Sequence, residues 1–397
     1  MQVDSIPIID LFAGPGGLGE GFSRNPHGVQ QKKFKIALSI EKDPHAHKTL
    51  TTRAFFRQFP EGKAPDDYYS YLEREIDREE LFKRHPEEAL VAMEEAQNRT
   101  LGVDADISKL IGGKIKGHEK WVLIGGPPCQ AYSLAGRSRM LGLVKRNGES
   151  ERSFQKRKNT VQKKFELDHR HTLYREYLKI IADHCPPVFV MENVKGILSA
   201  KHGGELIFPK IIADLKDPNK AVSKKLRGPQ YRILSLVRKS DDLVGDSFQP
   251  RDYLIKAEDY SVPQARHRVI LLGVREDLPS TDLCVLKPEN GPSVFSVIRD
   301  LPKLTPGLSK GAGERSYEAL SAILEEPWWP SFMNDPSFFN VAKRMKQLLQ
   351  TLKPTDNRGS EFYKSKQKNT DHWYGDSKLT GVPNHQTRSH IRADLWL

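Results

Sequence analysis

Six short apolar runs, separated by longer amphipathic stretches, constrain the fold of this chain more than any other feature of its sequence. They are almost continuous in Val, Ile and Leu, which is typical of strands buried on both faces and therefore of a largely parallel sheet. One intervening stretch, 172–184, has helical spacing of its apolar residues. We therefore expect an α/β fold with a Rossmann-like, mostly parallel, doubly wound sheet. The six runs are 7–13, 35–41, 121–126, 187–193, 231–237 and 267–274.

Two segments interrupt this alternation. Residues 51–100 include a long charged stretch that predicts a helical surface insertion, and residues 135–170 are strongly basic and poor in apolar side chains, which predicts a loop. After about residue 275 the periodicity fades, and the sequence leaves the fold of the remainder unassigned. We expect a main domain over 1–275 and the start of a second region over 276–397.

The charge of the chain favours a polyanionic partner. The formal net charge is +12 and the pI is about 9.4, so nucleic acid is the first candidate, although a merely soluble basic protein has the same composition. The three cysteines are too few for a disulfide framework and suit a reducing, cytoplasmic compartment. We expect no metal site, because no paired Cys/His spacing is found, and no signal peptide, because the N-terminus has no basic start and no small-residue cleavage site. We expect no membrane partner, because no apolar run approaches the roughly 18 residues of a membrane helix.

A glycine-rich turn follows the first apolar run. In DLFAGPGG (10–17), Gly14, Gly16 and Gly17 allow a close approach of the backbone to a ligand. Glu41 ends the second run about 25 residues later, where nucleotide-binding α/β folds hold a ribose hydroxyl. This layout also suits a dinucleotide, because Gly19 and Gly21 fit the usual glycine spacing, so NAD stays open at this point.

A second candidate for this site comes from DADIS (104–108). Asp106 and Ile107 offer a polar and an apolar group side by side, which suits the edge and the face of an adenine. The alternative is that Asp106 is only a helix cap.

The stretch GGPPCQAYS (125–133) places Cys129 just after the third apolar run. In open α/β sheets, ligands bind at the carboxyl ends of the strands. Pro127 and Pro128 fix two φ angles and remove two N–H donors, so this turn is stiff and holds the sulfur in one direction. The motif predicts a nucleophile, although a simply buried cysteine remains the alternative.

Polar residues also follow or enter two other runs. Glu192 comes near the end of VFVMENV (188–194), so we expect it at the same sheet edge as Cys129 unless it is a solvent-facing acid. Gln264, Arg266 and Arg268 occupy alternate positions of SVPQARHRV (261–269), which predicts one polar strand face. Such a face needs an anionic or hydrogen-bonding substrate, unless it is simply exposed.

Taken in order, FAGPGG, GGPPCQAYS, MENVKG and VPQARHRV resemble the DNA (cytosine-5) methyltransferase family over roughly residues 6–275. The resemblance implies a methyltransferase fold that uses S-adenosylmethionine rather than NAD. It implies that the cofactor-binding residues are Phe12, Gly14, Gly16, Gly17, Glu41, Asp106, Ile107, Pro128 and Leu173.

The same resemblance implies covalent catalysis on a cytosine extruded from double-stranded DNA, as in a bacterial restriction–modification enzyme. Cys129 would attack C6, Glu192 would hold the N3/N4 edge, and Arg268, with Arg266 beside it, would contact the O2 side. Asn193 would order the cysteine loop, and the basic loop 135–170 would contact phosphates. The other substrate residues implied are Gln130, Ser133 and Gln264.

One feature departs from the family pattern. The Arg-rich and G-N-S-V-like segments that follow the family's recognition region are not found, and the tail NHQTRSHIRADLWL resembles the stretch that precedes that region. We therefore expect a C-terminally incomplete enzyme, with a C-terminal fragment or a cognate restriction system as possible partner. Alternatives are a tRNA cytosine-5 methyltransferase, an inactive nucleic-acid-binding remnant and, more distantly, a NAD dehydrogenase, which leaves Cys129 unexplained.

Overall fold

The chain was analysed as a computed structural model. It describes residues 5–24, 33–128, 150–154, 170–202, 205–223, 228–239, 248–279, 284–308, 322–351, 357–365 and 374–390. Contacts between residues divide the chain into two compact units. Unit 1 comprises Met1–Lys63 and His85–Ser293, and unit 2 comprises Ala64–Arg84 and Val294–Leu397.

Unit 1 is built on one large sheet whose strand order is β3-β2-β1-β4-β5-β10-β8, with β9 paired to β10. All neighbours from β3 to β5 are parallel, whereas β10 runs antiparallel to β5, β8 and β9. This confirms the expected α/β class with a mostly parallel sheet. The strands are β1 (Ile6–Leu11), β2 (Phe34–Glu41), β3 (Ala96–Asn98), β4 (Val122–Gly125), β5 (Val188–Val194), β8 (Tyr231–Leu234), β9 (Leu254–Lys256) and β10 (His267–Arg275).

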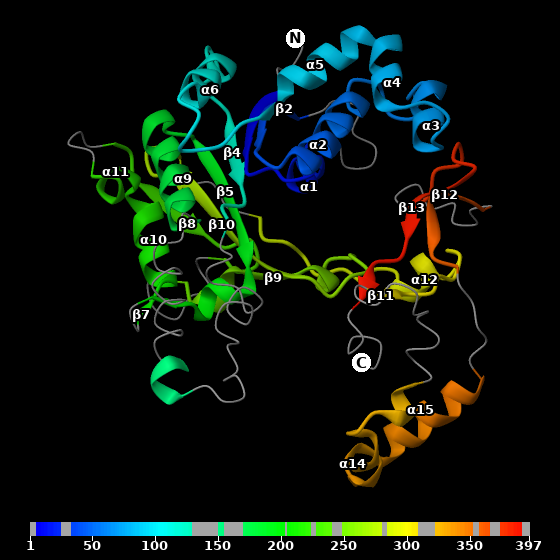
Figure 1. Cartoon of the computed structure of the whole chain (residues 1–397). Helices are drawn as coiled ribbons and strands as arrows, with labels where there is room; N and C mark the ends of the chain where they lie inside the picture. Colours follow the sequence, from blue (N-terminus) through cyan, green and yellow to red (C-terminus); the bar gives the residue numbers. More distant parts are fainter. Residues whose placement is uncertain are drawn as a thin grey trace. The chain divides into compact units, whose positions relative to one another are not determined.

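Helices lie against both faces of this sheet. Figure 1 shows α9 and α10, in green, beside the central strands, and the core on their side also includes residues of α6. The other face packs with Leu18 and Phe22 of α1. The helices of unit 1 are α1 (Gly17–Ser23), α2 (Pro44–Phe56), α5 (Pro86–Glu95), α6 (Ile107–Ile115), α9 (Arg170–His184), α10 (Phe208–Lys216) and α11 (Pro218–Ala221); β6 (Lys201–His202) pairs with β7 (Glu205–Leu206).

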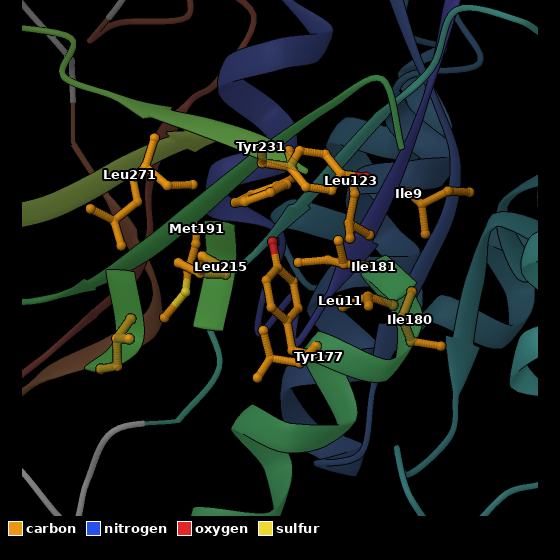
Figure 2. Packing of buried hydrophobic residues seen from close by; sticks show 14 of the residues in the cluster. Ile9, Leu11, Leu123, Tyr177, Ile180, Ile181, Met191, Leu215, Tyr231 and Leu271 are labelled. Atoms are coloured by element: carbon orange, nitrogen blue, oxygen red, sulfur yellow. The ribbon is translucent and has the colours of Figure 1, made fainter. Parts of the chain in front are cut away.

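Alternation along each central strand builds the two cores. On β1, Ile9 and Leu11 contribute to the α9 side, whereas Ile8 contributes to the α1 side. Figure 2 shows the ring of Tyr177, from α9, among the buried side chains of this first core, including Leu123 and Met191. The central strands are therefore buried on both faces, which is why their sequences are continuously apolar.

Unit 2 combines part of the predicted insertion with the region after residue 293. Its larger sheet is the antiparallel pair β12–β13, and a small core around Ile323, Trp329 and Ala342 joins α14 to α15. Its elements are α3 (Asp66–Leu72), α4 (Arg78–Arg84), α12 (Val294–Ile298), β11 (Gly307–Leu308), α14 (Trp329–Asn334), α15 (Phe339–Thr351), β12 (Gly359–Lys364), β13 (Gly381–Gln386) and β14 (Ser389–His390). The predicted insertion 51–100 is mostly helical, but it begins within α2 and its end forms β3 of the central sheet, and only residues 64–84 of it group with unit 2.

Across the part of the chain that the structure describes, no helix combines the length and apolar character needed to cross a bilayer.

Candidate functional site

The candidate site lies at one edge of the sheet in unit 1. Because β2, β1, β4 and β5 are parallel, their carboxyl ends meet at the same edge. Antiparallel β10 begins there, since its Arg268 pairs with Val194 at the end of β5. The topology thus places five parts of the candidate site at this one edge of the sheet: the glycine turn, Glu41, the segment 126–128, Glu192 and Arg268.

Glu41 is fixed by backbone N–H groups at the end of β2. Its Oε2 accepts a hydrogen bond from the Gly14 N–H at 2.8 Å, and its Oε1 accepts one from the Asp43 N–H at 2.7 Å. The side-chain amide of Asn98 donates to the Glu41 carbonyl at 2.9 Å. The carboxylate is therefore held against the glycine turn, with lone pairs left to accept hydrogen bonds from ligand hydroxyls.

Two of the three glycines in the turn, Gly14 and Gly16, have a positive φ, and Gly17 does not. Gly16, the residue before α1, has φ of +89°, and a Cβ there would lie 2.9 Å from Leu50 Cδ1. Gly14 also has a positive φ, but a Cβ built on it meets no atom within 4 Å. Open space therefore adjoins the turn beside the Glu41 carboxylate, as a bound cofactor requires.

The expected adenine residues lie at the start of α6. Asp106 occupies the N-cap position but makes no capping hydrogen bond; instead its Oδ2 lies 3.5 Å from Arg99 Nε. Asp106 therefore lies at the cap position of α6, as the alternative predicted, but its side chain does not cap the helix. Ile107 is buried in the main core, as is Leu173 of α9. Phe12, partly buried against the same core, has a φ of +58°.

Glu192 and Arg268 form an ion pair at the boundary between β5 and β10. Arg268 Nε lies 2.6 Å from Glu192 Oε1, and the side chains are 25% and 29% exposed. The Nε–H is not directed at this oxygen, so the contact is an ion pair rather than a hydrogen bond. Gly126 makes room for it, because a Cβ there would lie 3.1 Å from Glu192 Oε2.

Asn193 ties β5 to the segment that leads to the cysteine. Its side-chain amide donates to the Pro127 carbonyl at 3.1 Å, and its Oδ1 accepts from the Val194 N–H at 2.9 Å. Pro127 is buried and Pro128 half-buried. Cys129, Gln130 and Ser133 lie outside the described residues, as does the segment 135–170 except for 150–154 and 170.

The prediction that Gln264, Arg266 and Arg268 share one face of a strand is wrong for the first two. Strand β10 begins at His267, so Gln264 and Arg266 precede it and are exposed in a turn, and only Arg268 follows the strand alternation. Two backbone hydrogen bonds shape this turn, from the Gln264 N–H to Val262 and from the Ala257 N–H to Arg266. Alternating polar residues cannot by themselves show where a strand begins.

Sequence reasoning missed a buried acidic group below the glycine turn. Asp10 of β1 is 1% exposed, and no side chain donates a hydrogen bond to its carboxyl oxygens. Burial raises the pKa of Asp10 to about 8, and positive Arg57 opposes this rise. Arg57 itself pairs with Glu95 and, at 2.9 Å, with Glu20. A single acid inside the apolar run PIIDLF is the signal that could have revealed this group.

Comparisons with known proteins show which sequences this chain resembles. Residues 93–227 match the family described as C-5 cytosine-specific DNA methylase. The chain is 32% identical over 322 residues to the type II methyltransferase M.Bpa9945I of Bacillus paralicheniformis, covering 75% of this chain and 61% of that protein. It is 25% identical over 307 residues to the type II methyltransferase M.DdeI of Desulfomicrobium norvegicum, covering 76% of this chain and 49% of that protein.

A third relative is the type II methyltransferase M.AquIA of a Picosynechococcus strain, 26% identical over 269 residues, with 68% of this chain and 71% of that protein covered. Among solved structures, the Entamoeba histolytica methyltransferase EhMeth matches with a TM-score of 0.41 and 16% identity over 80% of this chain and 66% of that chain. The chain thus spans about half to three fifths of the length of the first two relatives.

Proposed function

The chain belongs to the C-5 cytosine-specific DNA methylase family, and on this premise we propose that it transfers a methyl group from S-adenosylmethionine to C5 of cytosine in double-stranded DNA. The relatives are bacterial type II methyltransferases, which supports a role in restriction–modification. The proposed setting is a bacterial cytoplasm. The proposed partner is a cognate restriction system or a complementing C-terminal segment.

The observation that carries this proposal is the ion pair between Glu192 and Arg268, 2.6 Å apart, beside the segment 126–128. A carboxyl group and a guanidinium at one point supply a hydrogen-bonding group for the N3/N4 edge of cytosine and a donor for its O2. A hydride-transfer site has no need for this pair beside a cysteine loop, so the arrangement favours pyrimidine chemistry over NAD chemistry.

The proposed reaction starts with the thiolate of Cys129. Its electron pair forms a bond to C6 of the ring, and electron density moves toward N3, which takes a proton from the acid form of Glu192. C5 would then take the methyl group as the S–CH3 bond of the sulfonium breaks and S-adenosylhomocysteine is left. C5 gives up its proton to a base, and the C6–S bond breaks to restore the aromatic ring and the thiolate. This covalent route divides one difficult step into easier ones. Positive charge from Arg268 would favour the thiolate form.

The cofactor supplies an electrophilic methyl group when it is bound. The open space at Gly14 and the Glu41 carboxylate beside it support a site for a ribose and a methionine moiety. In this proposal Glu41 accepts hydrogen bonds from the ribose hydroxyls, and the turn from Phe12 to Gly17 surrounds the methionine part. Asp106, Ile107, Pro128 and Leu173 complete the proposed set.

A cytosine inside a duplex must leave the base stack before a cysteine can reach it, which costs a few kcal/mol. We infer that Gln130, Ser133 and Gln264 surround the extruded nucleotide and that the basic segment 135–170 contacts phosphates. Asn193 would order the cysteine loop through its hydrogen bond to Pro127.

A mechanism-based trap tests the proposal. Duplex DNA in which 5-fluorocytosine replaces cytosine should form a covalent adduct with the protein in the presence of S-adenosylmethionine, because fluorine at C5 cannot leave as a proton does. The Cys129→Ser change should abolish the adduct, whereas Cys284→Ser, at an exposed cysteine, should not. An adduct that survives Cys129→Ser would show that another residue attacks. An adduct only with 5-fluorocytosine-containing tRNA would replace DNA by tRNA as substrate.

A further inference from the structure

The loop 257–266 connects β9 to β10 and leads directly into the candidate site. The two strands form an antiparallel hairpin within unit 1, in which Arg268 pairs with Ile255. The Ala257 N–H donates to the Arg266 carbonyl at 2.9 Å, which closes the loop at its base. Because Arg268 is the second residue after the loop, a shift of the loop would move the start of β10 and this guanidinium with it.

A hydrogen bond between two side chains holds the base of this loop. His267 Nε2 lies 2.6 Å from Glu258 Oε1, and both side chains are partly exposed. Hydrogen bonds from the Glu258 backbone N–H, the His267 ring and the Arg266 N–H hold the pKa of Glu258 below its usual value. An ionised carboxylate only accepts hydrogen bonds, so the ring nitrogen is the donor. The Glu258 carboxylate thus joins the start of the loop to the residues at its end.

A second set of contacts holds the tip of the loop. The Ser261 N–H donates to the Glu289 carbonyl at 3.0 Å, and the Glu289 N–H donates to the Asp259 carbonyl at 2.9 Å. A Cβ on Gly291 would lie 2.5 Å from Ser261 Cα, so this later segment lies directly against the loop backbone. Ser261 has a φ of +62°, a strained conformation that persists only where surrounding structure holds it. Here the segment 289–291 holds it.

The guanidinium of Arg268 is supported by the residue that Glu258 holds. Its Nη1 donates to the His267 carbonyl at 2.8 Å, and its Nε lies 2.6 Å from Glu192 Oε1. The ring that Glu258 binds and the carbonyl that Arg268 binds therefore belong to the same residue. A shift of His267 would change the direction of the guanidinium relative to the Glu192 carboxylate.

We propose that Glu258 and the segment 289–291 form a clamp that holds the loop 257–266 at its base and its tip and so positions Arg268 for the reaction. Glu258, His267 and Gly291 are positioning residues in this proposal. It rests on the proposed function for the role of Arg268 toward cytosine, whereas the contacts of the clamp do not. Displacing a reacting group by about 1 Å can lower a rate by about a hundredfold, so loss of one part of the clamp should be measurable.

Amide hydrogen exchange of the full chain tests the base of the clamp without any activity assay. Glu258→Ala removes the carboxylate that binds His267, so the amides of 257–268 should exchange about tenfold faster, the equivalent of one charge-assisted hydrogen bond. The control Glu276→Ala removes an exposed carboxylate just after the other end of β10 and should leave this exchange unchanged. Equal exchange in Glu258→Ala and the unchanged chain would overturn the clamp.

Gly291→Ala tests the tip of the clamp in the same measurement. The backbone of Gly291 is not left-handed, so only the contact with Ser261 opposes an alanine there. The added methyl group should push the loop away, and the amides of 257–266 should again exchange faster. Gly113→Ala is the matched control, because a Cβ at that glycine meets no atom within 4 Å. Slow exchange of the loop in Gly291→Ala would overturn this half of the clamp.

Single-turnover methylation tests whether the clamp positions Arg268. In Glu258→Ala the rate constant of methyl transfer at saturating duplex DNA should fall about tenfold, while the Kd for S-adenosylmethionine stays the same. In an Arg268→Ala background, Glu258→Ala should cause no further loss, because the clamp acts through Arg268. Additive losses, or faster exchange with an unchanged rate, would overturn the positioning role. If the unchanged chain does not methylate DNA at all, the proposed function fails and the positioning role with it, and the exchange measurements still decide whether the clamp holds the loop.

Discussion

Asp10 is an acidic residue at the centre of a buried strand, between Ile9 and Leu11. Burial raises the pKa of its carboxyl group from 3.8 to about 8, whereas the positive charge of Arg57 and the backbone N–H of Gly19 oppose this rise. Burial also raises the pKa of nearby Glu95, although Arg57 opposes this rise. Gly19 leaves space for the group, because a Cβ there would lie 3.0 Å from Asp10 Oδ2. Burial therefore favours the neutral form of this carboxylic acid below the glycine turn.

We predict that this residue makes stability fall as the pH rises. Between pH 4 and 8 the unfolded chain has lost the Asp10 proton and the folded chain retains it, so the free energy of unfolding decreases by at most about 1.4 kcal/mol per pH unit. Asp10→Asn, which stays neutral, should flatten this dependence and stabilise the protein at pH 8. Urea unfolding at several pH values measures it. Asp300→Asn, at an exposed position, should leave the slope in place; an unchanged slope in Asp10→Asn would contradict the prediction.

At the scale of elements, strands β5 and β10 pack closely because Gly273 of β10 has no side chain. Gly273 pairs with Phe189, and a Cβ on Gly273 would lie 2.1 Å from Phe189 Cζ. The Phe189 ring is fully buried and packs on Tyr231, with centroids 5.1 Å apart. The ring therefore fills the place of a side chain at 273, and this packing joins the antiparallel strand to the parallel part of the sheet.

We predict that Gly273→Ala destabilises unit 1 by about 1–3 kcal/mol, because the methyl group forces the buried ring out of place. Chemical denaturation measures the change in the free energy of unfolding. Adding Phe189→Leu to Gly273→Ala should recover part of the stability, since a smaller side chain leaves room for the methyl group. As a control, Gly113→Ala inside α6 should not destabilise the protein, because a Cβ there meets no atom within 4 Å and alanine has the higher helix propensity. Equal stability of Gly273→Ala and the unchanged chain would refute this packing.

At the scale of the whole molecule, the positive charge is the property most relevant to DNA. The net charge is +12, and the segment 135–170 is among the most basic parts of the sequence. Lysine and arginine side chains that neutralise phosphates release counterions, so DNA affinity should fall steeply as the salt concentration rises. This effect depends on how many phosphates are neutralised and not on base sequence.

We predict that replacing Lys156, Arg157, Lys158, Lys163 and Lys164 by Gln weakens binding to any duplex. The slope of log K against log salt should become shallower by about 0.9 for each phosphate that the variant no longer neutralises. Fluorescence anisotropy with a random-sequence duplex measures this slope. Lys109, Lys114, Lys116 and Lys120, in and after α6, provide a control set, and their change to Gln should have a smaller effect. A slope that does not change would remove 135–170 from the DNA interface.

The sequence alone predicted six strands of the large sheet and placed Glu41 and Glu192 at the ends of two of them. Buried strands have local signatures, and the residues that follow them reach the edge wherever neighbouring strands are parallel. This is why the position of Glu41 at the tip of β2, and of Glu192 at the end of β5, could be inferred before the structure. The roles assigned to them came from the resemblance and stay proposals.

Other features were decided only by the tertiary structure. The direction of β10 has no signature in its apolar residues, yet it brings Arg268 to Glu192, 76 positions away in the sequence. Likewise, no local pattern joins Arg74 to Asn384 or leaves Asp10 without a side-chain donor. Apolar periodicity predicts which residues are buried, because apolar residues at the spacing of a helix or strand lie on the same face of that element. It does not show which distant segment packs against them, because that choice depends on how the whole chain folds.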